Sequence, residues 1–173
     1  MGYQTDFTGH VTIDPPLNSE EIAFLKKFAG TRRMKRSGGP YFVDGNGYAG
    51  QDDGPDKVFD HNRPPQGQPG LWCKWAPTDD GTRIEWNEHE KFYDAEKWMK
   101  YLIEHFIQPG ALAKDALPFL QANHVVNGII EAHGEDSEDR WDLIVRGNRV
   151  YVAEYKFVKG VEEEIVDTKE DEW

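Results

Sequence analysis

Apolar and polar residues alternate along the first segment of the chain. From Tyr3 to Ile13 the apolar residues fall at odd-numbered positions, and the even-numbered positions carry Gln, Asp, Thr or His. This period of two predicts a strand with one buried face. Pro15-Pro16 ends the pattern, because proline lacks the backbone donor that a strand ladder needs.

A helix is predicted directly after the two prolines. Asn18 is a favourable N-cap, and Glu21 three residues later completes a capping box. Leu17 and Ile22 occupy the positions of a hydrophobic staple. The apolar stripe of this helix is formed by Ile22, Leu25, Phe28 and Ala29, and Gly30 is a suitable C-cap.

Residues 30–70 break this regularity. They contain nine of the 17 glycines and five of the ten prolines. A segment of this length without clear periodicity inside a compact domain is usually functional or disordered. Aromatic and aliphatic residues are nevertheless scattered through it, so we expect an insertion that packs on the body of the domain, with a small hairpin over residues 44–47. These residues are Tyr41, Phe42, Val43, Tyr48 and Phe59.

Regular elements return from Leu71 onwards. The LWCKW segment (71–75) predicts a strand, and Ile84 and Trp86 mark a second strand after a turn. Asp94 is a candidate cap for a helix over residues 95–107. The remaining predicted elements are a short helix over 111–121 and strands over 124–132, 140–146 and 149–157, with Gly147-Asn148 as a two-residue hairpin turn.

This order of elements predicts an α+β fold. Paired strands and two main helices favour a two-layer sandwich in which both helices cover one face of an antiparallel sheet. The ferredoxin-like βαββαβ arrangement with an additional C-terminal strand fits the order best. We expect a single domain over residues 1–158, with residues 30–70 as a long Gly/Pro-rich insertion.

The charge distribution predicts an acidic C-terminal tail and argues against binding to nucleic acids and membranes. The formal net charge is −12, and residues 159–173 hold seven acids and two lysines, which predicts a disordered acidic tail. An acidic chain is repelled by phosphate backbones and anionic lipids, so general nucleic-acid binding and membrane-surface binding are not expected. The sequence has no membrane-spanning apolar run and no signal-peptide pattern at its start, so we expect a cytoplasmic protein.

Signatures of catalysis and metal binding are missing from the sequence. The six histidines form no metal-ligand motif, and no nucleophile elbow or glycine-rich phosphate-binding motif occurs. Cys73 is the single cysteine and lies on an apolar strand face, which is typical of a buried, inert thiol. We therefore expect no metal and no cofactor, and favour a non-catalytic protein.

A basic patch follows the first helix. Arg32, Arg33, Lys35 and Arg36 precede the glycine-rich segment that contains Tyr41. Arginine side chains beside glycine backbone can hold a phosphate or carboxylate. Alternatively, these cations balance the dipole of the helix end and pair with nearby aspartates at 52, 53 and 56.

A polar loop and an isolated tryptophan complete the candidate site. Asp60-His61-Asn62-Arg63 could contact a polar ligand, or Asp60 could orient His61 as a general base. Trp72 points away from the apolar face of its strand, either beneath the insertion or towards a partner. The predicted ligand-binding residues are Arg32, Arg33, Arg36, Tyr41, His61, Asn62, Arg63 and Trp72.

Several segments resemble a family of short uncharacterised proteins of bacteriophages, prophages and some bacteria. The segments are GYQTDFTG…PPLN, TRRM, NRPPQGQPGLWCKWAPTDDG…IEW and EKFYDAEKWMKYLI, and the likeness covers most of residues 1–146. The most specific block is PPxGQPGLWCxW. More remotely, the W-x-P…IEW strand pair is similar to that of ferredoxin-like proteins of plasmids and phages. The resemblance implies a cellular context and no catalytic residue.

These observations lead to one main hypothesis and two alternatives. The main hypothesis is a small, soluble, non-catalytic accessory protein of a phage or mobile element, acting in the host cytosol, for example in counter-defence. It would engage a host protein or sequester a small anionic, nucleotide-like ligand. The first alternative is a nucleotide- or phosphoester-processing enzyme that uses Asp60, His61, His89 and Glu90, and the second is a nucleic-acid mimic.

Overall fold

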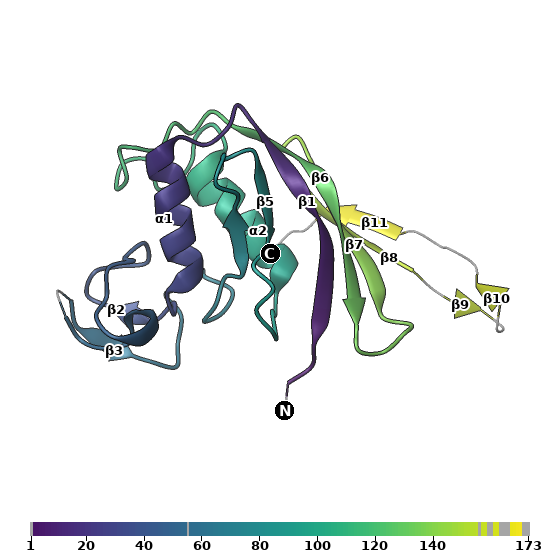
Figure 1. The fold of residues 1–173 in the computed structure, drawn as a ribbon, viewed down its shortest axis with the longest axis horizontal. Helices are drawn as coiled ribbons and strands as arrows, with labels where there is room; N and C mark the ends of the chain where they lie inside the picture. Colours follow the sequence, from purple (N-terminus) through teal and green to yellow (C-terminus); the bar gives the residue numbers. More distant parts are fainter. Residues whose placement is uncertain (1, 55, 156, 159–160, 163–166, 171–173) are drawn as a thin grey trace.

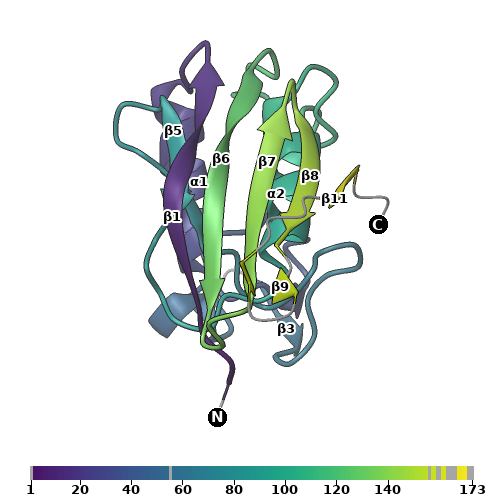
Figure 2. The same cartoon turned by 90° about the vertical axis from the view of Figure 1, so that its right-hand side faces the viewer.

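The computed structural model describes residues 2–54, 56–155, 157–158, 161–162 and 167–170. An antiparallel sheet forms one layer, and α1 and α2 lie against one of its faces (Figures 1 and 2). The predicted α+β class, with both helices on one face, is thereby confirmed. The elements of the sheet and of its helical layer are β1 (Thr5–Asp14), α1 (Ser19–Gly30), β4 (Trp75–Pro77), β5 (Arg83–Trp86), α2 (Ala95–Leu102), η2 (Ile103–Ile107), β6 (Val125–Gly134), β7 (Arg140–Arg146), β8 (Arg149–Glu154) and β11 (Asp167–Glu170).

The strands follow the order β11-β8-β7-β6-β1-β5-β4, and neighbouring strands are antiparallel. β1 is an interior strand and pairs with β6 from Thr5↔Gly134 to Asp14↔Val125. α1 lies between β1 and β4 in the chain, and α2 lies between β5 and β6. In the sheet, β5 lies between β1 and β4, and β1 lies between β5 and β6, so the connection through each helix crosses over one strand.

The start of α1 agrees in detail with the sequence. Asn18 Oδ1 accepts a hydrogen bond from the backbone N–H of Glu21 at 2.7 Å, and Glu21 Oε1 accepts one from the N–H of Asn18 at 2.8 Å. This reciprocal pair is the predicted capping box. The two-residue turn between β7 and β8 is also as predicted, because Gly147 and Asn148 adopt φ values of 54° and 73°.

The hydrophobic core lies between the helices and the inner face of the sheet. Phe28 and Phe106 are completely buried, and their ring centroids lie 5.2 Å apart. Phe7 on β1 packs edge-on against Trp75 at 5.2 Å. Further fully or nearly fully buried members of this core are Val11, Leu25, Trp98, Met99, Ile130 and Leu143. A core of this kind fixes the segments around it, including the insertion.

Two predicted elements differ in the structure: the strand predicted from Leu71 is shorter, and the helix predicted over 111–121 is absent. The strand predicted from Leu71 starts only at Trp75. The carbonyl of Leu71 instead accepts a hydrogen bond from the N–H of Arg33, so this segment is tied to the insertion rather than to the sheet. Residues 111–121 form turns and no helix, consistent with Pro118 inside that segment.

Two predicted local motifs also differ from the structure. Asp94 precedes α2, but its backbone is left-handed (φ 55°) and its side chain makes no capping hydrogen bond. Residues 44–47 form no hairpin. Asn46 pairs through an isolated bridge with Asp52, and a 3-10 turn, η1 (Tyr48–Gly50), lies between them.

The C-terminal region is described in three short pieces. β9 (Phe157–Val158) pairs with β10 (Val161–Glu162), and β11 pairs with the edge strand β8. The other residues of the predicted acidic tail lie outside the described part of the chain, so their disorder stays a prediction. Within the described residues, neither helix has the length and apolar character needed to cross a membrane.

Candidate functional site

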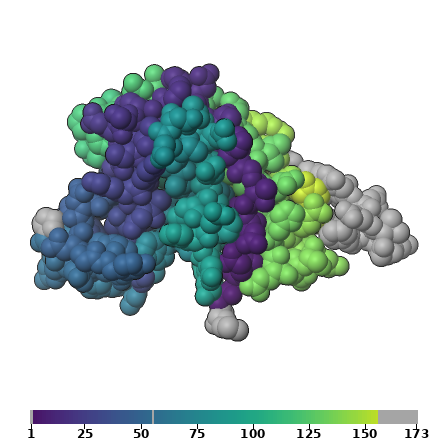
Figure 3. Space-filling model, viewed as in Figure 1, coloured from purple at the N-terminus to yellow at the C-terminus, as the bar shows by residue number. Residues whose placement is uncertain are grey.

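The insertion folds as a lobe beside the C-terminal end of α1 (Figures 1 and 3). Two short strands organise it, β2 (Lys35–Arg36) and β3 (Val58–Asp60), which pair antiparallel. Tyr41 and Val43 pack against the main core, as expected for an insertion that covers the body. Tyr48 and Phe59 do not follow this expectation, since they are 85% and 64% exposed.

Arg33 fixes the insertion to the body of the domain. Its side chain is buried (2% exposed) and stacks over the Phe28 ring at 4.3 Å from the centroid. Its guanidinium donates hydrogen bonds to three backbone carbonyls, those of Thr31 (3.2 Å), Pro40 (3.3 Å) and Phe42 (2.6 Å). Burial lowers the pKa of Arg33 to about 10. Because all three of its nitrogen atoms already donate to carbonyls, Arg33 is a structural side chain in this arrangement.

Arg36 is also buried and belongs to the interior of the insertion. Its Nη2 donates to the carbonyl of Gly50 at 2.9 Å, and its Nη1 lies 3.7 Å from Oδ2 of the buried Asp56. Of the basic patch predicted over Arg32, Arg33, Lys35 and Arg36, the structure buries Arg33 and Arg36, and Arg36 lies beside Asp56, one of the aspartates of the alternative interpretation. A glycine-rich insertion leaves many carbonyls without partners when it packs, and two of the three arginines satisfy them.

Tyr41 does not line the pocket that holds Arg32 and Trp72. Its hydroxyl forms a hydrogen bond with Nδ1 of His105 at 2.7 Å, and the His105 ring stacks on Tyr101 at 3.8 Å. Burial lowers the pKa of His105 to about 4, so this imidazole is neutral at pH 7. Tyr41 also lines an apolar pocket of about 500 Å³ with Phe24 and Phe119.

Arg32 and the 61–62 loop do come together, as the sequence suggested. Arg32 Nε donates to the carbonyl of His61 at 3.0 Å, and Nη2 donates to Asn62 Oδ1 at 3.4 Å. The Nε atom of Arg63 lies 3.6 Å from Oδ2 of Asp60. The loop thus orients Arg32, whose remaining nitrogen, Nη1, forms no hydrogen bond within the described part of the chain.

Arg32 and Trp72 line the same pocket, which we call the Arg32 cleft. It has a volume of about 450 Å³, within the range of small-molecule sites. Lys74 and Lys91 add two further cations, and Tyr93 adds a second aromatic ring. The other lining residues are Gly70, Leu71, Glu90 and Asp94. Three cations and two aromatic rings around one hollow can hold a small anion that carries a flat ring.

Lys74 is the most enclosed lysine of the cleft. Its ammonium donates a hydrogen bond to the backbone carbonyl of Glu90. Partial burial lowers the pKa of Lys74, the charge of Glu90 opposes that shift, and the neighbouring charge of Lys91 adds to it. An anion in the cleft would relieve this repulsion between the two lysines.

The loop that forms the other wall of the cleft has an unusual backbone. Glu88, Lys91 and Asp94 all adopt left-handed conformations, with φ values of 67°, 59° and 55°. Such conformations are unfavourable for residues other than glycine, and in folded proteins they gather where a loop positions side chains for function. Two of the three residues, Lys91 and Asp94, line the cleft.

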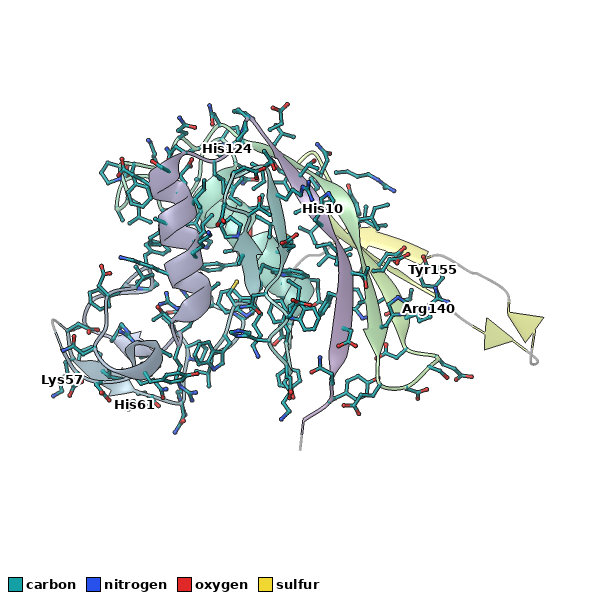
Figure 4. All side chains as sticks on the ribbon, in the orientation of Figure 1. His10, Lys57, His61, His124, Arg140 and Tyr155 are labelled. Atoms are coloured by element: carbon teal, nitrogen blue, oxygen red, sulfur yellow. The ribbon has the colours of Figure 1, made fainter. Side chains whose placement is uncertain are left out.

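The groups of the predicted enzyme site make other contacts. Asp60 accepts a hydrogen bond from the N–H of Asn62 at 2.9 Å, and the His61 ring contacts the carbonyl of Gln51 at 3.2 Å. The described residues show no hydrogen bond or ion pair between this loop and His89 or Glu90. They also contain no group of three metal-ligating side chains, and His10, His61 and His124 lie on separate elements (Figure 4).

Sequence reasoning did not assign four residues of the cleft to the binding site: Lys74, Lys91 and Tyr93 were not named, and Glu90 was named only for the alternative enzyme site. The available signal was weak, because Lys74 sits in a predicted strand and the other three precede a helix. Their approach to Arg32 depends on the register between β4, β5 and the insertion, which no local pattern encodes. Comparison of the chain with protein-family models, with curated proteins and with solved structures found no match.

Proposed function

We propose that this chain is a non-catalytic binding protein that holds a small anionic ligand in the Arg32 cleft. The observation that carries the proposal is the convergence of Arg32, Lys74 and Lys91 beside Trp72 around a hollow of about 450 Å³. Of the two activities considered from the sequence, ligand sequestration and engagement of a host protein, the cleft favours the first. A nucleotide-like anion fits best, since its phosphate suits the cations and its base suits the Trp72 ring.

The cellular context of the proposal comes from the sequence resemblance to phage and prophage proteins. In that context the chain is an accessory protein of the host cytosol. The strand order β6-β1-β5-β4, with a helix crossing over one strand in each half, supports a ferredoxin-like core that β7 and β8 extend. The acidic net charge fits a discrete anion site better than general binding to nucleic acid.

The proposal is tested by calorimetry with inorganic phosphate, pyrophosphate, nucleosides and nucleoside monophosphates. We expect at least one nucleotide to bind with a stoichiometry of one, and Arg32→Ala or Trp72→Ala to weaken that binding by about tenfold. Arg83→Ala is the matched control, because Arg83 is exposed on β5 and does not line the cleft. If no anion of the panel binds to the folded chain, or if Arg83→Ala is as harmful as Arg32→Ala, the proposal is wrong.

A further inference from the structure

A second pocket opens on the other side of the loop that borders the Arg32 cleft. It lies between the N-terminal end of α2 and the inner faces of β1, β7 and β8, and its volume is about 430 Å³. Tyr93 and Asp94 line both pockets, while the other lining residues differ. We call this second hollow the Trp141 pocket.

Aromatic rings form the walls of the Trp141 pocket. Phe7 contacts Phe92 at 5.7 Å and Trp141 at 6.0 Å between ring centroids, and both pairs are steeply inclined. Tyr3 and Tyr93 are 43% and 52% exposed at this pocket. Trp141 is also partly exposed, and the accessible face of an aromatic ring attracts an ammonium group.

All charged side chains that line the Trp141 pocket are acidic. Four carboxylates line it, those of Asp94, Glu96, Asp139 and Glu154, and none of the described lining residues is Lys, Arg or His. Asp139 accepts a hydrogen bond from the Tyr3 hydroxyl at 2.7 Å, and Lys97 approaches Asp94 at 3.9 Å. The pocket therefore favours a positively charged occupant.

The spacing of the carboxylates determines the kind of cation. The described residues contain no group of three acidic, histidine or cysteine side chains close enough to hold a metal ion. The four carboxylates instead line a hollow together with aromatic side chains. A divalent metal requires oxygen ligands at about 2 to 2.6 Å from a single point, whereas an alkylammonium ion fills a larger volume and tolerates dispersed charges.

We infer that the Trp141 pocket binds a small organic cation, an alkylammonium ion whose charged head lies among the carboxylates and whose carbon atoms contact the rings. Two further properties support this assignment. Burial raises the pKa of Glu96, hydrogen bonds from the backbone N–H groups of Glu96 and Lys97 partly oppose the shift, and the nearby charge of Asp94 adds to it, so a bound cation would stabilise the ionised carboxylate. The net charge of −12 also attracts cations to the chain.

The inference is tested by calorimetry at low ionic strength on the full-length chain. Choline and cadaverine are the cationic probes, 1,5-pentanediol is an uncharged analogue of cadaverine, and magnesium chloride tests for a metal. We expect one of the two amines to bind with a stoichiometry of one, and the diol and magnesium not to bind. The substitution Glu154→Gln should weaken amine binding by about threefold to fivefold, because it removes one exposed carboxylate of the pocket.

Glu131→Gln is the matched control, since Glu131 is exposed on β6 and does not line the pocket. It should leave amine binding unchanged, whereas equal weakening by both substitutions would indicate general attraction to an acidic chain and would overturn the inference. Trp141→Leu tests the aromatic wall independently, with a thermal melt to show that the variant is folded. Binding of the diol as tightly as cadaverine, tighter binding of magnesium than of either amine, or failure of both amines to bind would also contradict it. None of these outcomes concerns the Arg32 cleft.

Discussion

The imidazole of His124 lies against the carboxylate of Glu21, with Nε2 3.0 Å from Oε2, and both side chains are completely buried. The other ring nitrogen, Nδ1, lies 2.6 Å from the carbonyl oxygen of Pro15. The Pro15 carbonyl is an acceptor, so Nδ1 donates to it, and an ionised Glu21 carboxylate accepts from Nε2, which makes the imidazole the protonated form. The pair joins the start of α1 to the segment that enters β6, at residues 103 positions apart in the chain.

Removal of either partner should destabilise the domain strongly. In His124→Ala the Glu21 carboxylate stays buried without its counter-charge, and the Pro15 carbonyl loses its donor. Breaking one side of a buried ion pair costs about 3 to 5 kcal/mol, so we expect a loss of this size in the free energy of unfolding. Urea denaturation followed by tryptophan fluorescence measures it. Glu20→Ala, at the exposed neighbouring position, should change the free energy by less than about 0.5 kcal/mol.

The same pair should give stability a defined pH dependence. Burial alone lowers the pKa of His124, but its hydrogen bonds to Glu21 and Pro15 outweigh this and raise the pKa above its ordinary value of 6.5. The stability contributed by His124 is therefore fully present below pH 6.5 and is lost as the pH rises through the raised folded-state pKa. Burial also raises the pKa of Glu21, yet hydrogen bonds from His124, Asn18 and Gln121 lower it below 4.5.

The Glu21 contribution is accordingly present above pH 4.5 and is lost as the pH falls through the lowered pKa. The difference in unfolding free energy between the native chain and His124→Gln should thus be largest between pH 4.5 and 6.5 and should decrease on both sides. Denaturation curves across this range measure the difference. A difference that instead rises with pH up to about pH 6.5 and then stays constant would show that the imidazole is buried in its neutral form.

These residues illustrate what could be predicted from the sequence. The capping box of Asn18 and Glu21 was readable, because a cap involves residues three positions apart. The second role of Glu21, as the partner of His124, was not readable, because it depends on how β6 enters the sheet. The two-residue turn at Gly147-Asn148 was likewise predictable from its local chemistry.

The candidate site was predictable only in part, for a similar reason. Arg32, His61 and Asn62 were named together and do lie together, and Trp72 shares a pocket with Arg32. Four basic residues within five positions, however, are typical of an exposed surface, and the sequence does not show which of them meet carbonyl groups inside a packed insertion. That choice depends on tertiary structure, as does the approach of Lys74 and Lys91 to the cleft.

Cys73 should be unreactive in the folded protein. Its side chain is completely buried, and burial raises the pKa of the thiol to about 12, so almost no thiolate exists at pH 8. Ellman's reagent should release no thionitrobenzoate from the native chain, and one equivalent after unfolding in urea, because the chain has one cysteine. Ser137→Cys, which adds an exposed thiol between β6 and β7, is the positive control. Rapid modification of native Cys73 would contradict the burial.

The hydrogen bonds of Arg33 should stabilise the packing of the insertion on the body of the domain. Arg33→Met keeps much of the apolar stem but leaves the carbonyls of Thr31, Pro40 and Phe42 without their donor, which should lower the free energy of unfolding by about 2 to 4 kcal/mol. Arg33→Lys should recover little, because one ammonium cannot match the fork of the guanidinium. Lys35→Met, at an exposed position, is the control. Limited chymotrypsin digestion should cleave Arg33→Met faster at Tyr41 and Phe42, and unchanged cleavage with unchanged stability would show that the insertion is held by its apolar contacts alone.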